Sequence, residues 1–152
     1  MASNTVICYF DFETTGLNHP TQQGVGIVSI GAIFGNKKFH RFMLPMYPIT
    51  AKASEIHGIV KDGDNLLLNG TPIDDVSSPE DGIRAFFRFI RKNSDGYSKV
   101  ILCAHNCFGY DKKVLENHLQ ELDIDMPPLS FSDSMTLAKE YKARGVYVYI
   151  LT

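Results

Sequence analysis

The sequence has no large excess of charge and no long apolar run, and each shortage limits what the chain can be. It carries 17 Asp and Glu against 15 Lys and Arg, a net charge of −2. A wholly basic surface for tight non-specific binding to nucleic acid is therefore not expected, although a local positive groove or a metal-bridged phosphate site stays open. No apolar run approaches the ~20 residues that a membrane helix needs, so we expect no membrane partner.

Cysteine is also scarce. The three cysteines, Cys8, Cys103 and Cys107, form an odd set without disulfide-like spacing, which predicts buried free thiols in a reducing compartment. The run CAHNC lacks a second pair of ligands elsewhere, so a zinc site is disfavoured. The first four residues do not resemble a signal peptide. We expect the protein in the nucleus or the cytoplasm.

The pattern that is present is that of one α/β domain, and 152 residues suffice for one hydrophobic core. Short connections make the first three strands antiparallel neighbours. The first strand begins with five apolar residues in a row, which predicts burial on both of its faces. Apolar or alternating runs predict five strands, at residues 6–12, 25–34, 39–45, 100–104 and 129–132.

Helices are predicted from 79 to the break at 93, at 110–122 and from 133 to 142, with a short helical turn at 51–57. The rest of 47–76 is predicted to be loop because glycine, proline, Asp and Asn recur there without a clean period. The order βββ-α-β-α-β-α predicts a mixed five-stranded sheet with flanking helices.

Two carboxylates, Asp11 and Glu13, end the first strand. Side chains alternate along a strand, so these two point to the same side, ~7 Å apart along the chain. Two like charges held together are costly unless a cation or a shared proton lies between them. Asp111 begins a helix just after the fourth strand, which in a mixed sheet can lie beside the first. Three converging carboxylates predict a site for one or two Mg²⁺ ions that clamp a phosphodiester.

Each of these residues also has a plainer interpretation. Asp11 and Glu13 could end a strand in solvent, which the apolar run before them and the TTG turn after them disfavour. Asp111 could be an ordinary helix N-cap, and alone it would be interpreted so. Ordinary surface or loop positions are favoured for His57, His105, Asn106 and the lysine pairs at 37–38 and 112–113.

Several motifs together resemble the DEDD, or DnaQ-like, 3′–5′ exonucleases. DFETTGL (11–17) is similar to their first motif, VSIGAIF (28–34) to their second strand, PITAKASEIHGI (48–59) to a characteristic segment, and AHNCFGYDKKVL (104–115) to their second motif. FSDSMTLAKEY resembles the strand and helix that follow. The H-N-x-x-x-Y-D spacing is that of the TREX-like branch, which includes the three-prime repair exonucleases and the related domain in some PML proteins.

The resemblance implies a ribonuclease H-like fold and Mg²⁺-dependent cleavage of single-stranded nucleic-acid 3′ ends, with DNA favoured and Mn²⁺ as a substitute. It also implies the roles of individual residues. Asp11, Glu13 and Asp111 match three of the four metal-binding acids. The turn Thr14, Thr15, Gly16 and Leu17 matches the part that holds the terminal nucleotide, with Leu17 as a wedge against the last base.

The family's third motif, H-x4-D, is not found: no histidine follows His118 and no Asp follows Asp133. The resemblance therefore implies a single domain over 1–152 that is incomplete at its C-terminus, without the last helix, which leaves a sheet face uncovered. A second copy of the chain or another partner could complete the site. The alternative is an inactive isoform or pseudo-exonuclease that binds nucleic acid or protein without cutting.

Overall fold

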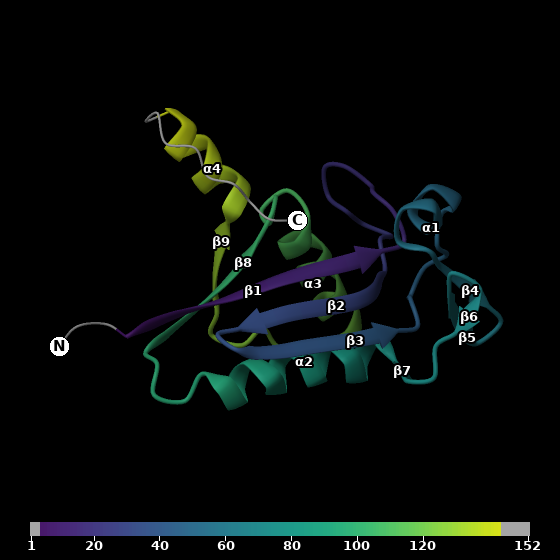
Figure 1. Ribbon diagram of the computed structural model, residues 1–152, viewed down its shortest axis with the longest axis horizontal. Helices are drawn as coiled ribbons and strands as arrows, with labels where there is room; N and C mark the ends of the chain where they lie inside the picture. Colours follow the sequence, from purple (N-terminus) through teal and green to yellow (C-terminus); the bar gives the residue numbers. More distant parts are fainter. Residues whose placement is uncertain (1–3, 144–152) are drawn as a thin grey trace.

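The computed structural model describes residues 4–143. The sequence GVYVYIL (145–151), whose apolar composition favours a strand, lies outside them. A mixed sheet of six strands forms the centre of the molecule (Figure 1). The order across the sheet is β7-β3-β2-β1-β8-β9. These strands are β1 (Thr5–Thr14), β2 (Ile27–Phe34), β3 (Lys37–Met43), β7 (Val76–Ser77), β8 (Lys99–Ala104) and β9 (Ser130–Asp133).

The pairing follows the predicted topology. β1, β2 and β3 are antiparallel neighbours, whereas β8 lies parallel to β1 and β9 lies parallel to β8. The expected position of the fourth predicted strand beside the first is confirmed, with Tyr9 opposite Cys103. The predicted number of five strands is wrong by one. The sixth, β7, pairs with β3 over two residues only, too few for a sequence period to show.

The helices α2 (Pro79–Asn93) and α3 (Asp111–Leu122) pack on one face of the sheet. A single core cluster joins apolar side chains of β1, such as Phe10 and Phe12, to Phe86 of α2 and Leu115 of α3. Side chains of β1 on the other face are exposed, with Tyr9 at 55% and Ile7 at 42%. The prediction of burial on both faces of the first strand is therefore wrong, because the described helices that contribute to this core cover one side.

A small three-stranded sheet interrupts the segment that was predicted to be loop. It comprises β4 (Ile59–Asp62), β5 (Asn65–Leu68) and β6 (Thr71–Pro72), and it buries Leu66 against Val28 and Ile59. The pair Asn69–Gly70 turns the chain between β5 and β6 with positive φ at both residues (50° and 85°). An Asn-Gly pair flanked by short β-prone runs is a hairpin signal, so this part was visible in the sequence.

The predicted helix ends are confirmed where side chains make them. Ser78 accepts a hydrogen bond from the amide of Asp81 and caps α2, while Asp133 accepts one from Met135 at the start of α4 (Ser134–Ala143). α1 (Ala51–His57) matches the predicted short turn. None of the helices in the described part of the chain is both long and apolar enough to span a bilayer.

Candidate active site

The end of β1 presents two of the predicted carboxylates on one side of the sheet. Asp11 is exposed and Glu13 is half-buried, and they alternate with the buried side chains of Phe10, Phe12 and Thr14. A β-bulge lies directly beside them: Glu13 pairs with Ser29 and the next residue, Thr14, pairs with Ile27. Bulges bend a strand and change the direction of its side chains, and they are common next to active sites.

The third carboxylate, Asp111, is the first residue of α3 and is only 2% exposed. The N-cap of the helix is Tyr110, whose side chain makes no capping hydrogen bond. The alternative in which Asp111 is merely an N-cap is therefore wrong. Its Oδ1 atom is buried and has no hydrogen-bond partner within residues 4–143. A buried carboxylate oxygen without a partner is costly and is usually explained by a function or a missing cation.

The three carboxyl groups influence one another. Burial, followed by the charge of Asp11, raises the pKa of Asp111 to about 7, against an opposing effect of the Phe12 amide. The Asp11 side chain lies at the exposed surface, but neighbouring protein atoms remove part of its water, which raises its pKa against the opposing effect of the same Phe12 amide. The pKa of Glu13 is raised by burial and by Asp11 and is lowered by His57. The structure thus brings Asp111 to Asp11, at the amide of Phe12, with Glu13 beside Asp11.

Part of this set fits a divalent cation. The donors are all hard carboxylate oxygens, one of which is an orphaned atom, and Mg²⁺ is commonly held by one or two carboxylates together with water and phosphate. Within residues 4–143, however, no group of three or more His, Cys, Asp and Glu side chains lies close enough together to hold a metal. The arrangement as it stands therefore fits a cation held by the pair Asp11 and Asp111, with Glu13 next to it.

The turn after β1 uses most of its polar groups internally. The Oγ1 atom of Thr15 accepts a hydrogen bond from the amide of Gly26 (2.8 Å), and the Thr14 hydroxyl donates to the carbonyl of Gly16 (3.1 Å). Leu17, in contrast, is 65% exposed. A cavity of about 510 Å³ opens beside this turn, lined by Phe12, Glu13, Thr14, Gly16, Leu17, Thr50, Lys52, Ala53, Ile56, His57 and Tyr110.

His57, for which a loop role was favoured, ends α1 and fastens it to the turn. Its Nδ1 atom accepts a hydrogen bond from the amide of Ile59 (3.1 Å), so Nε2 carries the proton and donates to the carbonyl of Thr14 (2.9 Å). His57 therefore lines the cavity and holds the turn through hydrogen bonds at both ring nitrogens. Its position in the segment that resembles the exonuclease family was the signal that could have singled it out.

The loop between β1 and β2 holds α3 in place. The side chain of Gln22 is fully buried and donates to the carbonyl of Gly109 (3.4 Å). Lys113 and Asn117 of α3 donate to the carbonyls of Pro20 (2.6 Å) and Thr21 (3.1 Å). These contacts fix the helix that carries Asp111, and nothing in the sequence periods indicates them.

The remaining polar candidates do not join the carboxylates in this site. All three cysteines are free and buried, as predicted. His105 is exposed, with Ser134 as its neighbour (3.5 Å). The lysines at 37 and 38 are exposed, in agreement with the surface interpretation.

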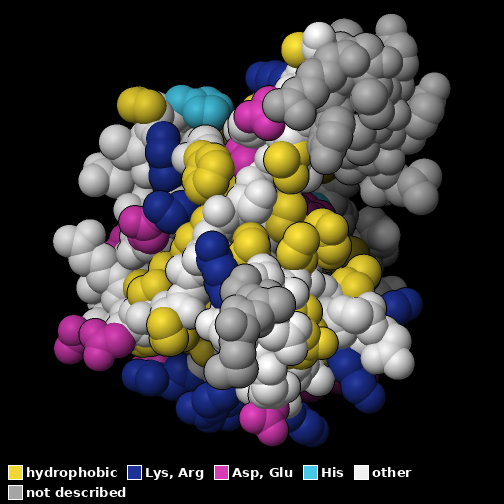
Figure 2. Space-filling model, turned by 90° about the vertical axis from the view of Figure 1, so that its left-hand side faces the viewer, with side chains coloured by type: hydrophobic (Ala, Val, Ile, Leu, Met, Phe, Trp, Pro, Cys, Tyr) yellow, Lys and Arg dark blue, Asp and Glu magenta, His cyan; other side chains and the backbone are white. Residues whose placement is uncertain are grey.

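Positive side chains gather along the lower edge of the face in Figure 2, the side of α2 in Figure 1. The exposed positive residues of α2 are Arg84, Arg88, Arg91 and Lys92.

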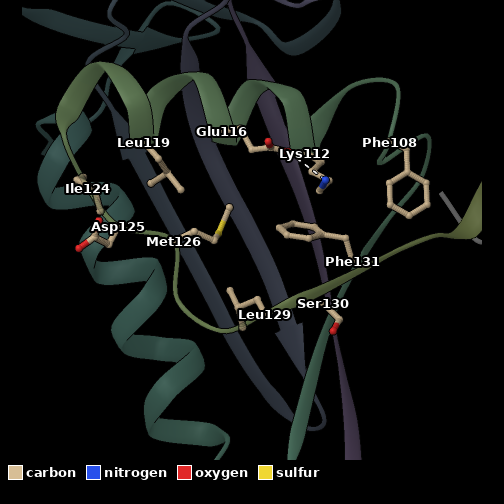
Figure 3. A pocket seen from close by; sticks show the side chains of 10 residues that line it. All are labelled: Phe108, Lys112, Glu116, Leu119, Ile124, Asp125, Met126, Leu129, Ser130 and Phe131. Atoms are coloured by element: carbon tan, nitrogen blue, oxygen red, sulfur yellow. Dashed lines mark ion pairs between the residues drawn. The ribbon is translucent and has the colours of Figure 1, made fainter.

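A separate cavity of about 710 Å³ lies between α3 and the segment that leads into β9 (Figure 3). An ion pair between Lys112 and Glu116 (3.2 Å) lies on its helix side, and the Lys112 ammonium is 5.4 Å from the centre of the Phe131 ring. Asp111 is not among its lining residues, and the hollow is therefore distinct from the carboxylate site. Its apolar lining residues are Phe108, Leu119, Ile124, Met126, Leu129 and Phe131.

Known proteins resemble parts of this chain in sequence and most of it in fold. No family model matches the chain. An alignment 97 positions long, which covers 59% of the chain, shows 37% identity to DNA polymerase III subunit epsilon of Buchnera aphidicola subsp. Schizaphis graminum. The matched region corresponds to 37% of that subunit's length, so this chain spans well under half of its curated relative.

Two solved structures have the same fold. The nuclease domain of 3′hExo, a DEDDh family member bound to rAMP, is similar over 95% of this chain and 74% of its own, with a TM-score of 0.65 and 14% identity. E. coli Exonuclease I in complex with a dT13 oligonucleotide is similar over 91% of this chain and 30% of its own, with a TM-score of 0.65 and 17% identity. The predicted fold, a ribonuclease H-like mixed sheet with flanking helices, is confirmed. The sequence match supports a relation to the DnaQ-like exonucleases.

Proposed function

We propose that this chain is a DnaQ-like 3′–5′ exonuclease domain that hydrolyses phosphodiester bonds at nucleic-acid 3′ ends with Mg²⁺, for which Mn²⁺ can substitute. One observation carries the proposal: Asp111 is buried with an orphaned Oδ1 and is near enough to Asp11 for that charge to raise its pKa, although the two residues are 100 apart in the sequence. A carboxylate with a purely structural role would have both oxygens paired, and the Oδ1 atom of Asp111 has no partner in the described part of the chain.

The residues then have distinct roles. Asp11 and Asp111 would hold the cation, and Glu13 would add a third negative charge beside it. Bound there, the cation would supply charge to the reacting phosphate and lower the pKa of an attacking water. The carboxylates provide its negative field, and their like charges would disfavour the site without it. Removing either aspartate should therefore lower the rate of cleavage severely.

Single-stranded DNA ends are the proposed substrate. Leu17 is exposed on the rim of the 510 Å³ cavity next to Glu13, where an apolar side chain can contact a terminal base. The similar structures hold an oligonucleotide and rAMP, which supports a nucleic-acid end as the substrate here. The H-N-x-x-x-Y-D spacing favours the TREX-like branch, and with it DNA over RNA.

The test is shortening of an oligonucleotide. Purified protein is mixed with single-stranded DNA labelled at its 5′ end, in Mg²⁺ or in EDTA, beside the Asp11→Asn and Asp111→Asn variants. We expect stepwise loss of nucleotides from the 3′ end in Mg²⁺ only, and a loss of activity on the order of 10³-fold or more in both variants. Cleavage that persists in EDTA, or at wild-type rate in both variants, would contradict the proposal.

The absence of a three-residue metal group within residues 4–143 favours a second candidate, a module that binds nucleic acid without cutting it. Binding of the oligonucleotide by wild type and by Asp11→Asn alike, with no shortening in either, would support this candidate.

The exposed apolar side chains Ile7, Tyr9 and Ile33 on the open sheet face support a homodimer as a further proposal. Light scattering on the same preparation distinguishes one chain from two.

A further inference from the structure

The Tyr110 hydroxyl connects the two halves of the candidate site. It donates a hydrogen bond to the carbonyl of Gly16 (3.1 Å) and contacts the Oγ1 atom of Thr14 in a second, short hydrogen bond. The Thr14 hydroxyl also lies 3.1 Å from the same carbonyl. Each hydroxyl has one proton to donate, so two hydrogen bonds at a time join this triangle of two hydroxyls and one carbonyl, which links the turn after β1 to the residue immediately before Asp111.

The backbone of Tyr110 makes this connection direct. Tyr110 is the N-cap of α3, with φ −139° and ψ −82°, and its side chain makes no hydrogen bond to its own helix. The side chain instead crosses to the turn that follows Glu13. Movement of the turn would therefore act on the first residue of α3, which is Asp111. Burial is the main cause that raises the pKa of Tyr110, and all three carboxylates add to it, so its hydroxyl lies within the influence of each of them.

The ring and the hydroxyl of Tyr110 have separable functions. The ring packs against the main core cluster and lines the cavity beside Leu17, which a phenylalanine would do equally well. The hydroxyl forms hydrogen bonds with Thr14 and with the carbonyl of Gly16. If the residue served packing alone, losing the hydroxyl would change nothing in the carboxylate site.

We propose that the Tyr110 hydroxyl is a positioning group, which locks the turn Thr14–Gly16 to the start of α3 and thereby sets the place of Asp111 relative to Asp11 and Glu13. The inference rests on the proposed exonuclease function and adds a residue to it. His57 fastens the same turn from the other side, through the carbonyl of Thr14. The turn is therefore fixed by α1 and by the N-cap of α3 together.

The test compares two tyrosines. Tyr110→Phe removes the hydroxyl from the triangle. Tyr47→Phe is the matched control because, among the described residues, the Tyr47 hydroxyl bonds to Glu121 alone, at 2.7 and 2.6 Å from its two carboxylate oxygens. We expect Tyr110→Phe to lower kcat about tenfold with KM changed less than about twofold, since a misplaced carboxylate affects the reacting geometry more than substrate binding. Equal kinetics in the two variants would overturn the inference.

A double-mutant cycle tests the coupling. Thr14→Val removes the other hydroxyl of the triangle, so the double variant with Tyr110→Phe should lose no more than about twofold beyond the worse single variant. If the loss of activity in the double variant instead equals the product of the two single losses, the two hydroxyls act independently, which also overturns the inference.

Hydrogen exchange separates this inference from the proposed function. If the wild type shortens no oligonucleotide, the proposed function fails. The positioning role of Tyr110 still predicts amide exchange about tenfold faster at residues 14–17 and 111–115 in Tyr110→Phe, and no faster exchange there in Tyr47→Phe. Unchanged exchange at these amides in Tyr110→Phe overturns the positioning role, whether or not kcat falls. Uniformly faster exchange across the core would indicate general destabilisation and overturn it as well.

Discussion

At the scale of single residues, the candidate site places carboxylates of like charge near one another, and one of them is buried. Asp111 is buried beside Asp11, its Oδ1 atom has no partner in the described part of the chain, and its pKa rises to about 7. Such a group lowers the stability of the folded state whenever it is ionised without a cation. Neither helix capping nor a partner for Oδ1 within residues 4–143 gives a structural reason for a carboxylate at Asp111. A function in binding a cation supplies one.

The raised pKa has a consequence for stability. Because the folded protein keeps the Asp111 proton up to about pH 7 while the unfolded chain releases it near pH 4, unfolding free energy should fall as pH rises between these values. Asp111→Asn removes this decline. In EDTA, we expect the variant to be more stable than wild type at pH 8 by about 1–3 kcal/mol and nearly equal to it at pH 4.5.

Urea denaturation of both proteins at pH 4.5, 6 and 8 measures the effect. Parallel pH dependence in wild type and Asp111→Asn, or a variant that is less stable at pH 8, would show that Asp111 is not the buried, proton-holding group described above.

At the scale of elements, the site depends on segments that a sequence pattern reveals only in part. Strand β1, with its two outward acids, and its parallel neighbour β8 were predictable because apolar runs of strand length ended in polar residues. The attachment of α3 was not, because it depends on single hydrogen bonds from Gln22 and Lys113 to distant backbone carbonyls. The bulge between Glu13 and Thr14 was equally unpredictable, because one extra residue in the pairing of two strands does not show in the hydrophobic pattern of the sequence.

The end of α1 provides a test at this scale. Gly58 caps the helix in the left-handed region (φ 74°), and a Cβ atom there would collide with the side chain of Asn69. Gly63 has a similar φ of 59° with open space around it. We expect Gly58→Ala to cost about 2–3 kcal/mol and Gly63→Ala about 1 kcal/mol, since only the first adds a clash to the backbone strain.

Urea denaturation of the two glycine variants gives the comparison, and exchange at the amides of residues 14–17 shows whether the loss reaches the site through His57. Equal destabilisation by the two substitutions would mean that Asn69 moves aside at little cost, and that the small sheet β4-β5-β6 does not brace α1.

At the scale of the whole molecule, the described helices α2 and α3 cover one sheet face, and the carboxylates of β1 lie on the other, beside exposed Tyr9. The sequence could predict the fold class because strands and helices alternate in a recognisable order. It predicted burial on both faces of β1, which is wrong, because five apolar residues in a row are equally typical of a strand whose second face is uncovered. The convergence of Asp111 with Asp11 needed both the parallel β1–β8 pair and the loop contacts to α3.

The central claim is that Asp11 and Asp111 hold a divalent cation. Titration of the metal-free protein with Mn²⁺, followed by the loss of the free-ion electron paramagnetic resonance signal, measures this without any substrate. Asp64→Asn, in an exposed turn, is the control for loss of one negative charge. We predict saturable Mn²⁺ binding by wild type and Asp64→Asn, weakened on the order of tenfold or more in both Asp11→Asn and Asp111→Asn. No binding by wild type at millimolar Mn²⁺, or binding that Asp111→Asn leaves unchanged, would contradict the account.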